Sequence, residues 1–186
     1  MDNKLVVLGI AGSLRKESIN KVLLRAAREL TPENMELEIH DISEIPVYNE
    51  DVRVQGFPET VAKLKEKIRG ADGLLIATPE YNYSIPGVLK NTIDWVSRPP
   101  VESPFNFKSL AIMGATGGLM GTVRAQIHLR QIAGYTNMIT MNRPEIFVQK
   151  ANEKFDKNGN LVDENTKEHL KKFLASFYDW ILRVRN

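Results

Sequence analysis

The sequence predicts an α/β fold, in which a parallel sheet of five strands has helices on both faces, so that the domain is a three-layer sandwich. Short apolar runs that suit strands alternate with longer segments whose apolar residues recur at helical spacing. Strands that alternate with helices form parallel sheets, because each helix carries the chain back across the sheet. The 186 residues suffice for one substantial core but not for two ordinary α/β domains. We therefore expect residues 1–186 to form a single domain.

The first half of the chain supplies three predicted strands and two predicted helices. Residues 4–11 (KLVVLGIA) form a short apolar run rich in β-branched side chains, and residues 35–40 (MELEIH) alternate as a strand near a sheet edge does. Apolar residues recur at helical spacing over residues 19–30 and again over residues 61–68. Residues 73–78 (GLLIAT) have the composition of a fully buried strand.

The second half completes five strands and five helices. Pro86 stands where a first-turn proline is tolerated, and a helical apolar pattern follows it until residues 98–100 (RPP) end the helix. The remaining elements are a strand, a helix, a short strand and a last helix, at residues 109–115, about 120–132, 138–140 and 170–181.

The predicted arrangement is flavodoxin-like, with strand order 2-1-3-4-5. Such sheets bind ligands beyond the carboxyl ends of their strands, at the point between strands one and three where the strand order reverses. The loops that follow strands one, three and four are therefore the expected ligand site.

The first of these loops, residues 12–20 (GSLRKESIN), opens directly into a helix. Hydroxyls of Ser13 and Ser18, the amide of Asn20, the guanidinium of Arg15 and the free N–H groups of a helix start are the donors that a phosphate dianion needs. The alternative is that Ser18 only caps the helix and Arg15 is a solvated surface charge. The GxxxxGK[ST] and GxGxxG patterns are absent, which favours a mononucleotide over a nucleoside triphosphate or a dinucleotide.

The other two loops suit a planar ring. Residues 78–87 (TPEYNYSIPG) combine two prolines that stiffen the turn with flat side chains at Tyr81 and Tyr83 and a polar group at Asn82. Residues 114–121 (GATGGLMG) lack bulky side chains near the sheet, so their backbone can approach a flat ligand closely. The alternatives are an ordinary turn and a flexible helix entry.

Three segments together resemble the NADPH-dependent FMN reductase family, and most of all its bacterial quinone and chromate reductases: GSLRKESIN, PEYNYSIPGVLKNTIDW and GATGGLMGTVRAQIHLRQ. The similarity runs in register from about Leu5 to Glu145. It implies an oxidoreductase that binds FMN non-covalently and uses NADPH or NADH as reductant. By ping-pong hydride transfer it would reduce a small-molecule acceptor such as a quinone, chromate, an azo compound or free flavin. Relatives assemble as homodimers or homotetramers, and we expect the same here.

The resemblance also implies the residues of the site. The FMN phosphate would be held by Ser13, Arg15, Ser18 and Asn20. The isoalloxazine would be flanked by Pro79, Glu80, Tyr81 and Asn82, and its pyrimidine side would be bordered by Thr116, Gly117 and Gly118. Tyr81 and Tyr83 are candidates for shaping the acceptor pocket, and no side chain is assigned as a catalytic acid or base. Arg124 and Glu145 either pair at a subunit contact or are separate surface charges.

Composition excludes several other classes of protein. The chain has no cysteine, so it holds no disulfide, iron–sulfur cluster or thiolate-bound zinc, and redox chemistry needs a bound cofactor. His40, His128 and His169 are isolated from one another, and we expect no metal site. Residues 156–160 (DKNGN) predict a turn, because their glycine does not match a calcium loop. A net charge of +2 from scattered Lys and Arg does not favour a nucleic-acid partner.

The start of the chain predicts a cytoplasmic protein. Residues 1–4 (MDNK) run directly into an apolar strand with no basic segment or cleavage site, and no later apolar run approaches bilayer length. We therefore expect no membrane association. The main alternative to an enzyme is a flavodoxin-type electron carrier, which would usually show a stronger field of one sign than +2 provides.

Overall fold

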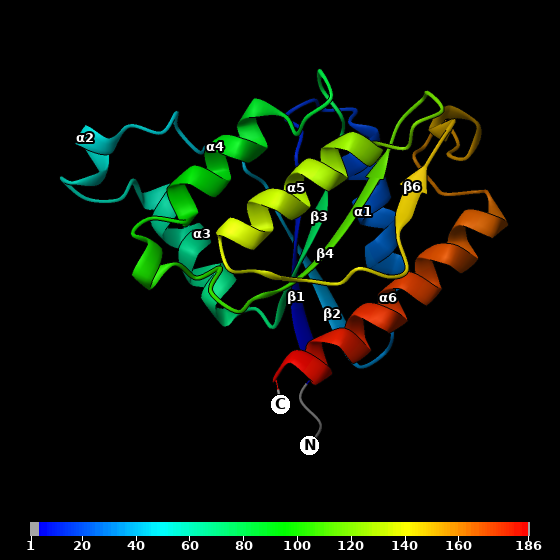
Figure 1. Cartoon of the computed structure of the whole chain (residues 1–186). Coiled ribbons are helices and arrows are strands. Elements are labelled where there is room, and N and C mark those ends of the chain that lie inside the picture. The colour runs from blue at the N-terminus through cyan, green and yellow to red at the C-terminus, as the bar shows by residue number, and fades with distance from the viewer. Residues whose placement is uncertain (1–3, 186) are drawn as a thin grey trace.

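The computed structural model describes residues 4–185 and has the expected alternation of strands and helices (Figure 1). The expected lead-in at residues 1–3 lies outside the described part. In chain order the elements are β1 (Leu5–Ala11), α1 (Ile19–Glu29), β2 (Met35–His40), α2 (Glu50–Arg53), α3 (Glu59–Gly70), β3 (Gly73–Ala77), α4 (Gly87–Val96), η1 (Pro100–Glu102), β4 (Ser109–Ala115), α5 (Val123–Tyr135), β5 (Ile139–Thr140), β6 (Ile146–Val148), η2 (Ala151–Glu153) and α6 (Glu164–Arg185). Among these residues no helix is long and apolar enough to cross a bilayer.

The sheet is parallel, and the order β2-β1-β3-β4-β5 confirms the flavodoxin-like prediction. The structure adds a sixth strand, β6, to the five that were expected. β5 pairs with Ser109 and Leu110 at the start of β4, whereas β6 pairs with residues 113–115 at its end. The fifth position in the sheet is therefore shared by two short strands. Pro144 lies between them and has no N–H to donate to a strand partner.

Helices α3 and α6 extend at both ends beyond the predicted residues 61–68 and 170–181, and two further differences concern α2 and α5. The short helix α2 was not expected, since its four residues are too few to show a helical period; its N-cap is Asn49, whose side chain accepts the N–H of Asp51 at 2.8 Å. Helix α5 begins at Val123, later than the expected start near Met120. Gly121 and Thr122 have φ of 59° and 64°, which a right-handed helix does not allow.

The core lies on both faces of the sheet. Helices α1 and α6 cover one face, and α3, α4 and α5 cover the other, as Figure 1 shows. Phe173 and Phe177 of α6 are fully buried in the first layer, and Trp95 of α4 is fully buried in the second. Each such side chain contributes roughly 1.5–3 kcal/mol by leaving water, so the two layers fix the sheet firmly.

The sheet register brings three loops to one edge. Ala11 at the end of β1 lies beside Ala77 at the end of β3, which in turn lies beside Met113 of β4. Residues 12–18, 78–86 and 116–122 therefore leave the sheet together, at its upper edge in Figure 1. Gly114 makes room for this, because a Cβ there would lie 2.6 Å from the carbonyl oxygen of Thr78 and would collide with Thr122.

Candidate functional site

The loop after β1 presents hydrogen-bond donors at the start of α1. Ser13 and Ser18 are buried, whereas Arg15 is exposed. The Ser13 hydroxyl accepts the N–H of Arg15 at 3.3 Å, and the N–H of Ser18 donates to the Arg15 carbonyl at 3.2 Å. Ser18 occupies the N-cap, yet its side chain makes no capping hydrogen bond. The capping alternative is therefore not realised, and the first-turn N–H groups of α1 lack intrahelical partners, as at every helix start.

The Asn20 side chain is used to position the loop after β4. Its Nδ2 donates to the Ala115 carbonyl at 3.0 Å, and its Oδ1 accepts the Ala115 N–H at 2.9 Å. The residue is 1 % exposed. This pair of bonds ties the first turn of α1 to the end of β4. The predicted contact of Asn20 with a phosphate stays a prediction. Only the backbone N–H of Asn20 or the second hydrogen on its Nδ2 could make this contact, because the other side-chain groups bind Ala115.

The loop after β3 forms a tight hairpin. Tyr81 and Ser84 exchange backbone hydrogen bonds of 2.9 and 3.0 Å, and the two residues between them, Asn82 and Tyr83, have φ of 50° and 66°. Two left-handed central residues are typical of a primed hairpin turn. Asn adopts this conformation readily, but Tyr adopts it at a cost of about 1 kcal/mol or more. Other contacts must therefore hold the hairpin in place.

Helix α5 supplies those contacts. The Glu80 carboxylate accepts hydrogen bonds from the backbone N–H groups of Arg124 and Ala125, at 3.0 and 3.3 Å. It also accepts a hydrogen bond from the Arg124 guanidinium, at 3.2 Å. Because the N-cap Thr122 makes no side-chain cap, Glu80 caps α5 from another loop. The Arg124 guanidinium also lies 4.1 Å from the centre of the Tyr83 ring.

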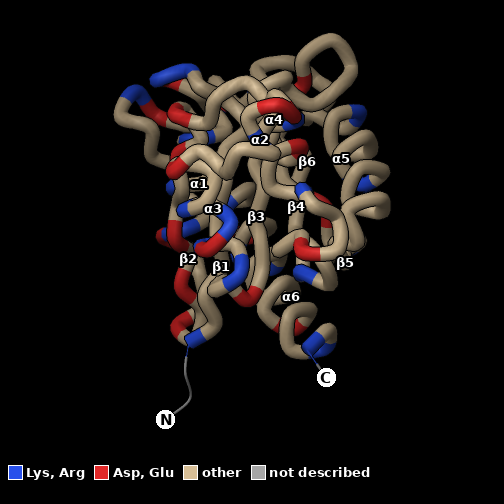
Figure 2. Tube along the Cα trace, turned by 90° about the vertical axis from the view of Figure 1, so that its left-hand side faces the viewer, with Lys and Arg blue, Asp and Glu red and all other residues tan. Residues whose placement is uncertain are grey.

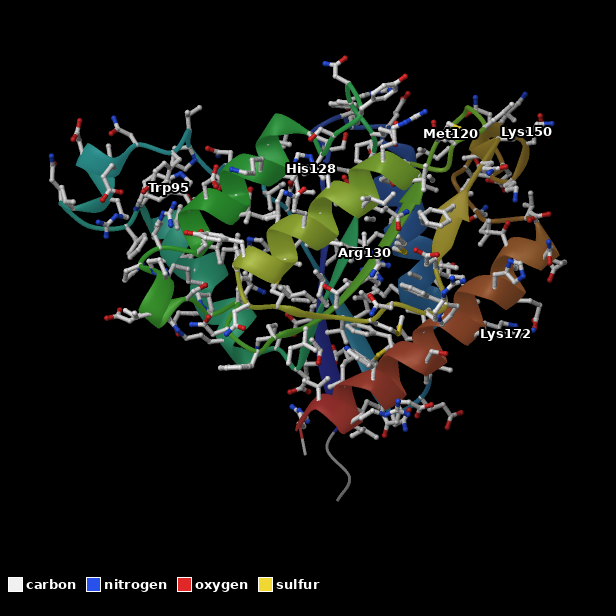
Figure 3. All side chains as sticks on the ribbon, in the orientation of Figure 1. Trp95, Met120, His128, Arg130, Lys150 and Lys172 are labelled. Carbon is white, nitrogen blue, oxygen red and sulfur yellow. The ribbon has the colours of Figure 1, made fainter. Side chains whose placement is uncertain are left out.

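A further contact joins the end of the hairpin to the same helix. The Ser84 hydroxyl lies 2.7 Å from Nδ1 of His128, which Figure 3 shows on α5. Arg124 and Glu145, which the sequence suggested as a pair, have different partners within the chain: Arg124 pairs with Glu80, and Glu145 lies 3.7 Å from Arg130. Whether either residue also lies at a subunit contact stays a prediction.

The loop after β4 is fixed by a segment that the sequence did not reveal. Thr116 donates its N–H to the Val148 carbonyl at 2.9 Å, and its own carbonyl accepts the N–H of Ala151 at 2.9 Å. Gly118 accepts the N–H of Lys150 at 2.9 Å, and Figure 3 shows Met120 and Lys150 at this same end of the molecule. The only signal in the sequence was the apolar trio of residues 146–148 (IFV), which is too short for a period.

The three loops lie at one edge of the sheet and offer two chemically different ends. One end offers the hydroxyls of Ser13 and Ser18, the Arg15 cation and the first turn of α1, which suit a phosphate. The other end offers glycine backbone and exposed apolar or aromatic side chains, among them Tyr81, Tyr83, Leu119 and Met120. A planar ring joined to a phosphate, as in FMN, fits this arrangement. The predicted ring contacts of Pro79 and Glu80 remain predictions, since the Glu80 carboxylate points to α5.

Comparison with known proteins identifies close relatives. The model of the NADPH-dependent FMN reductase family matches residues 5–153. An NAD(P)H-dependent FMN reductase of Pseudomonas aeruginosa is 49% identical over 185 residues, covering 100% of both chains, and a quinone reductase of Escherichia coli is 43% identical over 188 residues, again covering 100% of both. The solved structure of FerB, a flavoenzyme NAD(P)H:(acceptor) oxidoreductase from Paracoccus denitrificans, superimposes with a TM-score of 0.88 at 35% identity, covering 96% of this chain and 98% of that one.

Proposed function

Since the chain belongs to the NADPH-dependent FMN reductase family, we propose that it reduces quinones with NADPH or NADH through non-covalently bound FMN. One observation in the structure supports the proposal most directly: the start of α1, whose N-cap side chain makes no capping bond, and a braced aromatic hairpin lie at the same edge of the sheet. The relatives are named as reductases, which does not favour the alternative of an electron carrier.

The phosphate end of FMN is proposed to lie at the start of α1. Ser13 and Ser18 would donate their hydroxyls, Arg15 would supply a cation, and the first-turn N–H groups would point at the same anion. Arg15 is exposed, so it is free to close over the phosphate. Asn20 would act indirectly, because its side chain fixes the Ala115 backbone beside the ring.

The ring end is proposed to lie between the hairpin and the glycine loop. Pro79, Tyr81 and Asn82 would flank the isoalloxazine, while Glu80 would hold their loop against α5. Thr116, Gly117 and Gly118 would border the pyrimidine side of the ring through their backbone. When bound, FMN supplies the redox chemistry by accepting and then giving up a hydride. Tyr81 and Tyr83, both exposed, would line the place that the reductant and the acceptor occupy in turn.

Several finer assignments belong to the same proposal. Chromate, azo compounds and free flavin are proposed as further acceptors, because an open site does not demand one acceptor shape. The protein is proposed to form a homodimer or homotetramer, in which a second copy would cover exposed apolar groups such as Leu119 and Met120. We also propose a single domain over residues 1–186, a cytoplasmic location and no nucleic-acid partner.

An anaerobic titration tests the proposal. The protein reconstituted with FMN is expected to lose its flavin absorbance in the visible when NADPH or NADH is added, and to regain it when a benzoquinone follows. Steady oxidation of NAD(P)H with the quinone would reject a carrier role. A protein that FMN cannot reconstitute, or whose flavin neither reductant bleaches, would refute the proposed function.

A further inference from the structure

A hollow of about 210 Å³ lies beside α1, next to the end of β2. Its apolar lining residues are Ala11, Leu24 and Ile39, and α1 adds three basic residues: Lys21, Arg25 and Arg28. Cavities for whole drug-sized ligands run from roughly 300 Å³ upward, so this hollow suits one part of a larger ligand. None of the proposed flavin contacts lies in it.

The three basic residues form one stripe of uncompensated charge. Their spacing of four and three residues places them on the same face of α1. Within residues 4–185 none of the three belongs to an ion pair. Figure 2 shows α1 next to β2, in a part of the molecule where basic and acidic positions both occur. Such a stripe attracts an anion, and Arg in particular binds phosphate through paired N–H groups.

The residues that face the stripe from β2 do not cancel its charge. Asp41 is the one carboxylate of the hollow, and it also accepts the N–H of Ser43 at 3.0 Å. His40 contributes an uncharged ring, because burial and the nearby Lys67 lower its pKa, although Asp41 acts in the opposite direction. Three cations therefore stand against one carboxylate around an apolar hollow. A purine nucleotide has this combination, because its ribose carries both anionic phosphate groups and a flat, largely apolar base.

The position of the hollow relative to the sheet narrows the choice of ligand further. Ala11 ends β1, and His40 and Asp41 end β2, so the hollow lies at the same edge as the proposed flavin site. Strands lie about 4.8 Å apart, which puts the end of β2 roughly 10 Å from the end of β3. In doubly wound folds that bind dinucleotides, an acid at the end of the second strand holds the ribose 2′-OH, and a nearby Arg accommodates a 2′-phosphate. Arg25 and Arg28 line the same hollow as Asp41, at the end of the second strand.

We propose that this hollow binds the adenosine end of NADPH, with the adenine against Leu24 and Ile39 and the 2′-phosphate on Arg25 and Arg28. Lys21, which is nearer to the start of α1, would contact the pyrophosphate. The nicotinamide end would then reach across to the ring of the flavin. The inference rests on the proposed function for the identity of the reductant, and it adds a preference for NADPH over NADH.

A second hollow, of about 520 Å³, lies on the other side of α1, between Val22 and the turn at residues 155–159, and shares Arg25. With Arg25, its lining has three cations, Lys16 and Lys157 being the others, against the two carboxylates of Glu17 and Asp156, so its charges are closer to balance than the three against one of the first hollow. We therefore assign the 2′-phosphate to the first hollow. Lys157→Gln tests this choice, since it removes a cation from the second hollow alone.

Binding of adenosine 2′,5′-bisphosphate to the FMN-loaded protein tests the site without any turnover. Arg25→Gln combined with Arg28→Gln should raise the dissociation constant at least about tenfold, since each charged hydrogen bond to phosphate contributes strongly. Both side chains are exposed, so the variant should fold, and Lys21→Gln offers an independent single change. The control Lys172→Gln with Arg183→Gln removes the same charge from exposed positions of α6 and should change the constant less than about twofold.

Kinetics supply the second arm. In the Arg25 and Arg28 variant, KM for NADPH should rise about as much as the dissociation constant, kcat with a quinone should stay near its original value, and KM for NADH should change far less. Unchanged bisphosphate binding in this variant, an equal loss in the α6 control or an equal loss in Lys157→Gln would overturn the site. If the bisphosphate binds as expected but NADPH and quinone do not react, the site stands and the proposed function fails. If quinone reduction is normal but bisphosphate binding does not depend on Arg25 and Arg28, the proposed function stands and the site fails.

Discussion

Glu80 and Arg124 are joined twice, because the Glu80 carboxylate accepts both the backbone N–H of Arg124 at 3.0 Å and its guanidinium at 3.2 Å. Glu80 precedes the hairpin at residues 81–84, and Arg124 lies in the first turn of α5. The link therefore braces a turn with two left-handed residues against a helix. A hairpin that is held to a helix in this way has less conformational freedom to lose when a ligand binds.

Loss of this brace should destabilise the protein. Glu80→Gln keeps the size of the side chain but loses its charge, so the cap on α5 weakens and the free energy of unfolding should fall by about 1–2 kcal/mol. Urea denaturation followed by circular dichroism measures the change. Glu66→Gln removes an exposed ion pair with Arg69 and should cost under about 1 kcal/mol. Equal losses in the two variants would show that Glu80 is an ordinary surface charge.

Asn20→Ala should be more damaging than its small volume suggests. The change removes both partners of the buried Ala115 backbone groups, and each unsatisfied group costs about 1–3 kcal/mol. The expected loss in unfolding free energy is roughly 2–4 kcal/mol by chemical denaturation. Asn165→Ala, at an exposed position of α6, is the matched control and should lie within about 0.5 kcal/mol of the parent protein. A mild effect at Asn20 would mean that water replaces its amide.

Gly114→Ala tests how tightly the three loops meet. A Cβ at residue 114 would lie 2.6 Å from the Thr78 carbonyl, which is backbone and cannot rotate away. The melting temperature should fall by several degrees, which corresponds to a cost of about 1–3 kcal/mol. Gly70→Ala, where no atom lies within 4 Å of the added carbon, should be neutral or slightly stabilising. Equal melting temperatures for the two variants would contradict the close approach at residue 114.

Lys65 should make stability depend on alkaline pH. Burial, helped by the nearby Arg69, lowers its pKa to about 8, while Nζ donates to the Val96 carbonyl at 3.2 Å and also to that of Arg98. Between about pH 8 and 10.5 the unfolded chain keeps a proton that the folded protein has lost, so stability rises with pH. The gain disappears again as pH falls through 8.

Urea denaturation at pH 7, 9 and 10.5 measures this effect against Lys65→Met, which has no group to titrate. Relative to the variant, the native protein should gain up to about 3 kcal/mol across the range. Parallel pH profiles for the two proteins would show that the Lys65 ammonium keeps its ordinary pKa in the fold.

The sequence predicted the main strands, the long helices and the loops of the site because their patterns are local, whereas the strand order followed from the flavodoxin-like fold class. Periodicity marked every long helix, apolar runs marked β1, β3 and β4, and alternation marked β2. It did not show β6 or α2, which are three and four residues long and hold their places through partners distant in the chain. Contacts between residues distant in the chain likewise decide which polar side chains of the loops remain available to a ligand. From the local sequence, the side chains of Asn20 and Glu80 are free to contact a ligand, but in the structure they bind Ala115 and α5.

Flavin binding by the first turn of α1 is the central claim, and titration of the flavin-free protein measures it directly. Arg15→Ala combined with Ser18→Ala should weaken FMN binding about a hundredfold, since two hydrogen bonds to a charged phosphate are lost. Affinity for riboflavin, which has no phosphate, should be the same in the variant and the parent protein. An unchanged dissociation constant for FMN in the double variant would contradict the account.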